Sequence, residues 1–161
     1  MLAAIRSDTP LVPADFTYKL ARPRQHVVHD LLKAKTYVDS RWGVWRATYA
    51  FQHNFRQEYD VQRVETDDAQ LNLTLNTQTL NLNLEHNQLW KLKGEVGVDG
   101  IYQENLMQPG DRVFLPNYRS TGAALYAIER YYGSDWTLEG GLRYDYRWYE
   151  AFNPEGRNQQ V

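Results

Sequence analysis

Two long stretches of the chain alternate between apolar and polar residues, and this pattern constrains the fold more than any other feature. In residues 42–59 the odd-numbered positions, such as Trp45, are mostly apolar, and the even-numbered positions, such as Arg46, are mostly polar. Residues 136–148 repeat the pattern. A period of two residues is that of a β-strand with one apolar face. Both stretches are longer than the usual strand of about five or six residues.

Weaker alternation extends this pattern to further strands. Residues 71–84 contain two Leu-rich runs whose leucines change from odd to even numbers between Leu75 and Leu80. We expect a β-bulge near Asn76–Thr79, or a change from an extramembrane hairpin to a spanning strand. Residues 92–103 alternate less clearly, and residues 26–37 and 121–131 are expected strands whose facing the sequence leaves open.

The connections between these strands alternate in length. Short connections are expected at Val38–Trp42, His86–Leu92 and Tyr132–Asp135, and longer ones at Asp60–Gln70 and Glu104–Ser120. The sequence therefore predicts an all-β, antiparallel up-and-down meander of about six long strands. Short turns at one end and long loops at the other are typical of bacterial outer-membrane β-barrels. Residues 1–24 and 150–161 are expected to belong to the preceding and following loops.

Composition excludes several classes of protein and of site. The 161 residues carry 18 Lys+Arg and 20 Asp+Glu, a balance that argues against a nucleic-acid-binding surface. The absence of cysteine excludes disulfides, thiolate metal sites and a cysteine nucleophile. The longest apolar run is Ala123–Ile128, far short of the roughly 20 residues of a transmembrane helix. A mean hydropathy of −0.69 does not exclude a barrel, because only alternate side chains of a barrel strand face lipid.

Aromatic residues mark both ends of the most regular strand. Trp136 and Trp148 share one side of the alternation and lie about 40 Å apart along a strand, or about 30 Å across a tilted one. Aromatic side chains favour the membrane interface, where one part of the ring is wet. The expected interface aromatics are Trp42, Trp45, Trp136, Tyr144 and Trp148. An ordinary sandwich strand with aromatic core residues is the competing interpretation.

The opposite side of the strands carries charges of both signs, which suits either bulk water or a hydrated barrel lumen. Six strands cannot close a single-chain outer-membrane barrel, for which about eight is the minimum. An open sheet would leave unpaired backbone amides in lipid. We therefore expect a piece of a larger barrel or one protomer of an oligomeric barrel. Residues 1–15 do not form a secretory signal, which favours a piece.

At this point the motifs resemble those of TonB-dependent outer-membrane receptors. The segment Trp136–Glu150 is similar to their barrel strand W-x-L-x-x-G-x-R-Y-D. Looser similarities follow in the expected order along the chain, at His29–Lys35, Tyr49–Asp60 and Gly97–Tyr118. The residues that fit the strand motif are Trp136, Leu138, Gly141, Arg143, Tyr144 and Asp145.

The resemblance implies that residues 1–161 are a partial barrel domain, incomplete at both ends, of an active transporter in the outer membrane of a Gram-negative bacterium. Such receptors have about 22 strands and a plug domain within the lumen. They import scarce ligands, such as iron siderophores, haem, cobalamin or glycans, with energy from the TonB complex. The implied partners are outer-membrane lipid, the remainder of the barrel with its plug, and TonB through an N-terminal region absent here.

No arrangement of residues indicates catalysis, a cofactor or a metal site, and we expect no enzyme activity. If the loops bind ligand, guanidinium groups would hold anionic oxygens and a tyrosine would stack on a planar ligand. The candidate ligand-binding residues are Arg63, Asp67, Arg112, Tyr118 and Arg119.

Two other functions stay open. The alternative from a different class is a soluble or secreted antiparallel β module, sandwich or lipocalin-like, that binds a ligand or a protein. A smaller diffusion porin without a plug is a third possibility.

Overall fold

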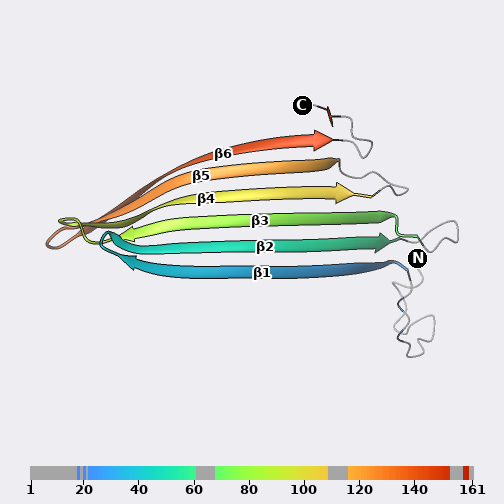
Figure 1. Ribbon diagram of the computed structural model, residues 1–161, viewed down its shortest axis with the longest axis horizontal. Coiled ribbons are helices and arrows are strands. Elements are labelled where there is room, and N and C mark those ends of the chain that lie inside the picture. The colour runs from blue at the N-terminus through green and yellow to red at the C-terminus, as the bar shows by residue number, and fades with distance from the viewer. Residues whose placement is uncertain are drawn as a thin grey trace, which may run out of the picture.

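Six long strands follow one another in a single antiparallel sheet, as the sequence predicts. The computed structural model describes residues 18, 20, 22–60, 68–108, 116–152 and 158–159. Each strand pairs with the next in chain order, and the sheet is open, since β1 and β6 do not pair with each other (Figure 1). The strands are β1 (Arg24–Ser40), β2 (Gly43–Tyr59), β3 (Leu71–His86), β4 (Leu92–Met107), β5 (Asn117–Tyr132), β6 (Thr137–Phe152) and the short β7 (Asn158–Gln159).

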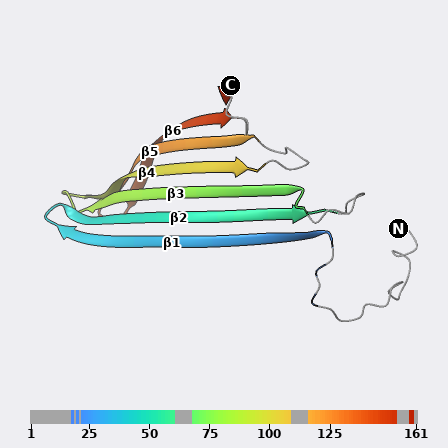
Figure 2. The ribbon, with the colours of Figure 1, turned by 45° about the vertical axis from the view of Figure 1, so that its right-hand side comes forward.

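The sheet is a single layer with almost no conventional core. Among the described residues, the buried hydrophobic side chains are only Ala50, Met107 and Ala124. The turn ends of β5 and β6 bend away from the plane of β1 to β3, so the sheet is curled rather than flat (Figure 2). Strands of 16 or 17 residues therefore carry most of their large apolar side chains on an uncovered surface.

The register assigns every strand residue to one of two faces, because directly paired residues in an antiparallel sheet point to the same side. We call the face that carries Leu82, Val98 and Leu125 the apolar face. The face that carries Asn81 and Asp99 is the polar face. The facing that the sequence left open for the first and fifth strands is now defined: even-numbered residues of β1 and odd-numbered residues of β5 lie on the apolar face.

The expected β-bulge near Asn76–Thr79 is wrong. β3 pairs without interruption with both β2 and β4 through this segment, from Leu73 to Glu85. Leu73 and Leu75 instead lie on the polar face, opposite to Leu80. Successive residues of β3 therefore alternate between the two faces without a break. Toward the loop end of the strand, the leucines lie on the polar face instead of the apolar face.

The expected strands lie where the structure has them, but several of the expected ranges are too short at one end. The expected connection Glu104–Ser120 is shorter in the structure, because β4 continues to Met107 and β5 begins at Asn117. The Asn117 Oδ1 atom accepts a hydrogen bond from the Met107 amide at 2.6 Å, which ties the two strand ends together. β6 likewise extends to Phe152, and β7 pairs with its last two residues rather than lying in an open loop.

The first turn depends on a glycine. Gly43 has a φ of 140°, and a Cβ atom there would lie 2.1 Å from the carbonyl oxygen of Glu85. Ser40 caps the same turn, since its hydroxyl donates to the Gly43 carbonyl at 2.9 Å and accepts from the Trp42 amide at 3.2 Å. The turn therefore fixes the register of β1, β2 and β3 together.

Candidate functional site

A belt of uncharged side chains crosses the apolar face from β1 to β6. It consists of four successive rows, with one residue from each of the six long strands in every row. In chain order the belt is Leu32, Ala34, Thr36 and Val38; Trp45, Ala47, Tyr49 and Phe51; Gln78, Leu80, Leu82 and Leu84; Val96, Val98, Gly100 and Tyr102; Thr121, Ala123, Leu125 and Ala127; and Leu142, Tyr144, Tyr146 and Trp148.

A row with polar residues bounds this belt on each side. On the side of the turns, this row contains Ser40 and a His86–Glu129 contact of 3.0 Å that bridges β3 and β5, together with three glycines, and Leu92, Tyr131 and Leu138 lie beyond it on the apolar face. At about 3.3 Å per residue, Asp30 and Ser40 lie about 33 Å apart along β1. The row on the side of the loops is entirely polar and consists of Asp30, His53, Asn76, Glu104, Arg119 and Glu150.

The belt is open rather than packed. Leu142 is 79% exposed, Tyr144 67% and Trp148 61%. Soluble monomers rarely expose contiguous apolar patches of more than a few hundred Å², so a surface of this kind marks contact with a membrane or with another protein.

The expected interface aromatics occupy different positions relative to the belt. Tyr144 and Trp148 lie within it on β6, and Trp45 lies within it on β2, half-buried. Trp42 lies in the turn before β2 and is exposed. Trp136 precedes β6 and stacks on Tyr131, with ring centroids 5.2 Å apart. Four of the five are thus exposed on the apolar face or at its turn end, and their place at a membrane interface stays a prediction.

The polar face carries linked ion pairs at the same level as the belt. The Arg143 guanidinium donates to Asp99 at 2.6 Å, across the intervening strand β5, and to Asp145 at 2.8 Å. Asn81 donates to Asp99 at 2.6 Å and so extends the network to β3. These contacts join the neighbouring strands β3 and β4 to β6, which lies two strands from β4, through side chains.

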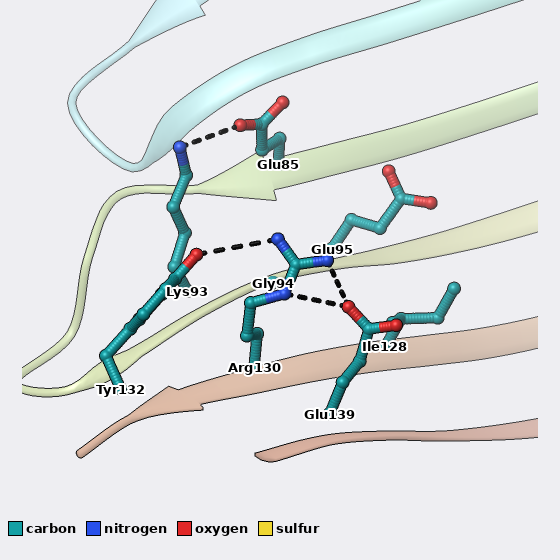
Figure 3. Close-up of a pocket in the computed structure, with 8 residues that line it drawn as sticks. All are labelled: Glu85, Lys93, Gly94, Glu95, Ile128, Arg130, Tyr132 and Glu139. Atoms are coloured by element: carbon teal, nitrogen blue, oxygen red, sulfur yellow. Dashed lines mark hydrogen bonds and ion pairs between the residues drawn. The ribbon is translucent and has the colours of Figure 1, made fainter. Parts of the chain in front are cut away.

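A second charged group lines a pocket of about 360 Å³ near the turns on the polar face (Figure 3). Arg130 forms an ion pair with Glu139, and its Nη1 atom donates to the Tyr132 hydroxyl at 3.5 Å. Lys93 contacts Glu85 at 3.3 Å, and Arg46 contacts the same carboxylate. The pocket wall therefore carries charges of both signs, most of them paired, rather than a field of one sign.

Glycines allow side chains to lie flat across the polar face. A Cβ atom on Gly97 would lie 2.5 Å from the ring of Tyr126. The Tyr126 ring occupies that space, and its hydroxyl accepts hydrogen bonds from Asn83 at 3.3 Å and Asn81 at 3.4 Å, both two strands away. Beside it, a hollow of about 490 Å³ lies over Gly122 and Ala124.

The candidate ligand-binding residues do not form one described site. Tyr118 and Arg119 are neighbours on β5 and therefore point to opposite faces. Tyr118 stacks on Tyr149 with centroids 5.1 Å apart, whereas Arg119 donates to Glu104 at 2.8 Å. Arg63, Asp67 and Arg112 lie outside the described residues.

Sequence reasoning missed two groups that only the register brings together. Arg147 donates to Ser120 at 2.8 Å and to Gln103 at 2.7 Å, and Ser120 is almost fully buried. The second group lies at the turns and includes Arg41 and Lys91, which lie against aromatic rings. The Arg and Lys residues were visible in the sequence, but nothing in it indicated their partners.

Comparisons of the chain with protein-family models, curated proteins and solved structures found no significant match. In the part of the chain that the structure describes, no helix has the length and hydropathy needed to cross a membrane. The same residues contain no group of three or more His, Asp or Glu side chains placed to hold a metal ion. The two contrasting faces of the sheet are thus its most informative functional feature.

Proposed function

We propose that this chain forms part of the wall of an outer-membrane β-barrel transporter of the TonB-dependent receptor type. The apolar face contacts hydrocarbon and the polar face lines the hydrated interior. The observation that carries this proposal is the uncharged belt, which lies back to back with a polar face that is charged in the same stretch of four strands, β1, β2, β4 and β6.

The height of the belt supports a lipid contact. Strands of outer-membrane barrels are tilted by roughly 40°, so the span of about 33 Å between the polar rows projects to about 25 Å. This is the height of the outward apolar band of such barrels. The polar rows would then lie at the two membrane surfaces, where charged and polar groups reach water.

The polar face suits a lumen for a separate reason. Buried or confined charges are tolerated when they are paired, and Arg143 with Asp99 and Asp145 is such a network. Receptors of this type hold a plug domain inside the barrel, so a wall of mixed, compensated charges gives the plug a hydrated surface to contact.

The open sheet requires further strands. Among the described residues, nothing pairs with the outer edge of β1, and β7 covers only two residues of β6. Each unpaired backbone group in hydrocarbon costs several kcal/mol. The remaining strands of the barrel would pair with these edges, and ligand import would depend on them, on the plug and on the TonB complex. The ligand class implied by the resemblance is a scarce nutrient such as an iron siderophore, haem, cobalamin or a glycan.

Fractionation of a Gram-negative host tests this proposal. The protein should remain with the outer membrane after salt and carbonate washes, and it should migrate differently on gels with and without heating. Release into the soluble fraction, together with a second layer packed on the belt, would instead support a soluble antiparallel β module that binds a ligand or a protein.

A further inference from the structure

The turn end of the sheet holds a group of cations and aromatic rings, which we call the turn cluster: Arg41, Trp42, Trp90, Lys91 and Tyr131. Hydrogen bonds fix two of its turns to each other. The Asn87 amide donates to the Trp42 carbonyl at 2.8 Å, and the Asn87 side chain donates to the Arg41 carbonyl at 3.1 Å. The turn before β2 and the turn before β4 therefore form one surface.

Both cations of the turn cluster lie on rings rather than beside carboxylates. The Arg41 guanidinium is 4.6 Å from the centroid of Trp42, and the Lys91 ammonium is 5.8 Å from that of Tyr131. Within the described part of the chain, neither cation has an acidic partner. Cation–π contact holds the charge in place and leaves its donors available to an anion.

Trp90 gives an independent indication that this surface has a binding role. It has a φ of 59°, in the left-handed region that bulky residues rarely adopt, and its side chain is 83% exposed. Gly or Asn would fit this backbone with less strain. A strained and exposed indole at the margin of an apolar belt suits the membrane interface, where Trp is enriched.

We propose that the turn cluster binds the phosphate of an anionic phospholipid in the leaflet that faces the turns. This inference rests on the proposed function, because it requires the belt to lie in a bilayer. Basic side chains beside a lipid-facing surface attract anionic headgroups. The indole of Trp90 and the ring of Tyr131 would lie at the level of the headgroups while Arg41 and Lys91 contact the phosphate.

Native mass spectrometry of the detergent-extracted protein tests the inference. The protein is titrated with phosphatidylglycerol, with phosphatidylcholine and with glycerol phosphate, which carries the phosphate without the lipid. We expect tightest binding of phosphatidylglycerol. The double variant Arg41→Gln and Lys91→Gln should weaken that binding by roughly twenty-fivefold, which is about fivefold for each cation removed.

The matched control is the double variant Lys33→Gln and Lys35→Gln, which removes the same charge from exposed positions on the polar face of β1. It should bind phosphatidylglycerol as the unmodified protein does. Equal affinity of the Arg41/Lys91 variant and this control, or equal binding of both lipids by the unmodified protein, would overturn the inference and leave the proposed function intact. Failure of the protein to enter the membrane fraction would contradict the proposed function itself.

Discussion

At the scale of single residues, Gly43 is the position where the backbone depends most on the absence of a side chain. Two features disfavour a side chain at this position: the φ of 140°, and the distance of only 2.1 Å that would separate a Cβ atom from the Glu85 carbonyl oxygen. Gly43→Ala should therefore lower the free energy of unfolding by about 3 kcal/mol, through backbone strain and displacement of β3. Denaturant unfolding of the folded protein in detergent micelles measures this loss.

Gly140 supplies the matched control for that substitution. It lies on the apolar face of β6, and a Cβ atom there would meet no other atom within 4 Å. Gly140→Ala should change the free energy of unfolding by less than about 0.5 kcal/mol. Equal effects at the two glycines would show that the turn before β2 does not fix the register.

At the scale of one element, β1 offers a direct comparison of the two faces. Leu31 is 61% exposed on the polar face, and Ala34 is exposed on the apolar face in a middle row of the belt. If the belt contacts lipid, Ala34→Arg should destabilise the folded protein in vesicles by about 2–4 kcal/mol, because a charge near the bilayer midplane is poorly solvated. Leu31→Arg should cost less than about 1 kcal/mol. Urea unfolding in vesicles compares the two, and equal costs would contradict a lipid contact specific to one face.

The strands differ in how far their sequences predicted them. β2 and β6 were predicted with their facing, because each has one apolar and one charged side. β1 and β5 were predicted as strands without facing, since Leu31 and Leu32, or Ala124 and Leu125, place apolar residues on both sides. In these strands only pairing with a neighbour decides the face, and pairing is a property of two segments rather than one.

The leucines at the start of β3 show why one expectation failed. Their change from odd to even numbers indicated a slip of the backbone, but the pairing with β2 and β4 is continuous. On the apolar face Gln78 and Asn76 replace the leucines toward the loops, while Leu73 and Leu75 lie on the polar face. The sequence recorded a change in the polarity of the two faces along a regular strand. The other alternative, a change from an extramembrane hairpin to a spanning strand, stays a prediction.

The candidate site was predicted in its residue types and not in its connections. The apolar side of the belt follows from alternation, and so does the charged character of the opposite side. Arg143, however, bonds to Asp99 across an intervening strand, and Tyr118 and Arg119 separate onto different faces. These relations depend on the register and on the residue at which β5 begins. The hydrogen bond from the Met107 amide to the Asn117 side chain helps to fix that start.

At the scale of the whole molecule, the described residues form a sheet with an open margin at β1, a margin at β6 that β7 covers over only two residues, and no second layer. A soluble sheet of this length would need a partner layer on the belt, whereas a barrel wall needs lipid on the belt and strands at both margins. The two arrangements therefore differ in what the apolar face contacts. They share the same strand order and register.

Site-directed spin labelling along β6 tests the central claim most directly. The chain contains no cysteine, so single cysteines at positions 138–148 can each be labelled without a background. In the membrane-bound protein, even-numbered labels such as those at Leu142 and Tyr144 should collide with oxygen, which concentrates in hydrocarbon. Odd-numbered labels such as those at Arg143 and Arg147 should collide with a water-soluble nickel complex. Even-numbered labels that are shielded from both reagents, or that are accessible to the nickel complex, would contradict the account.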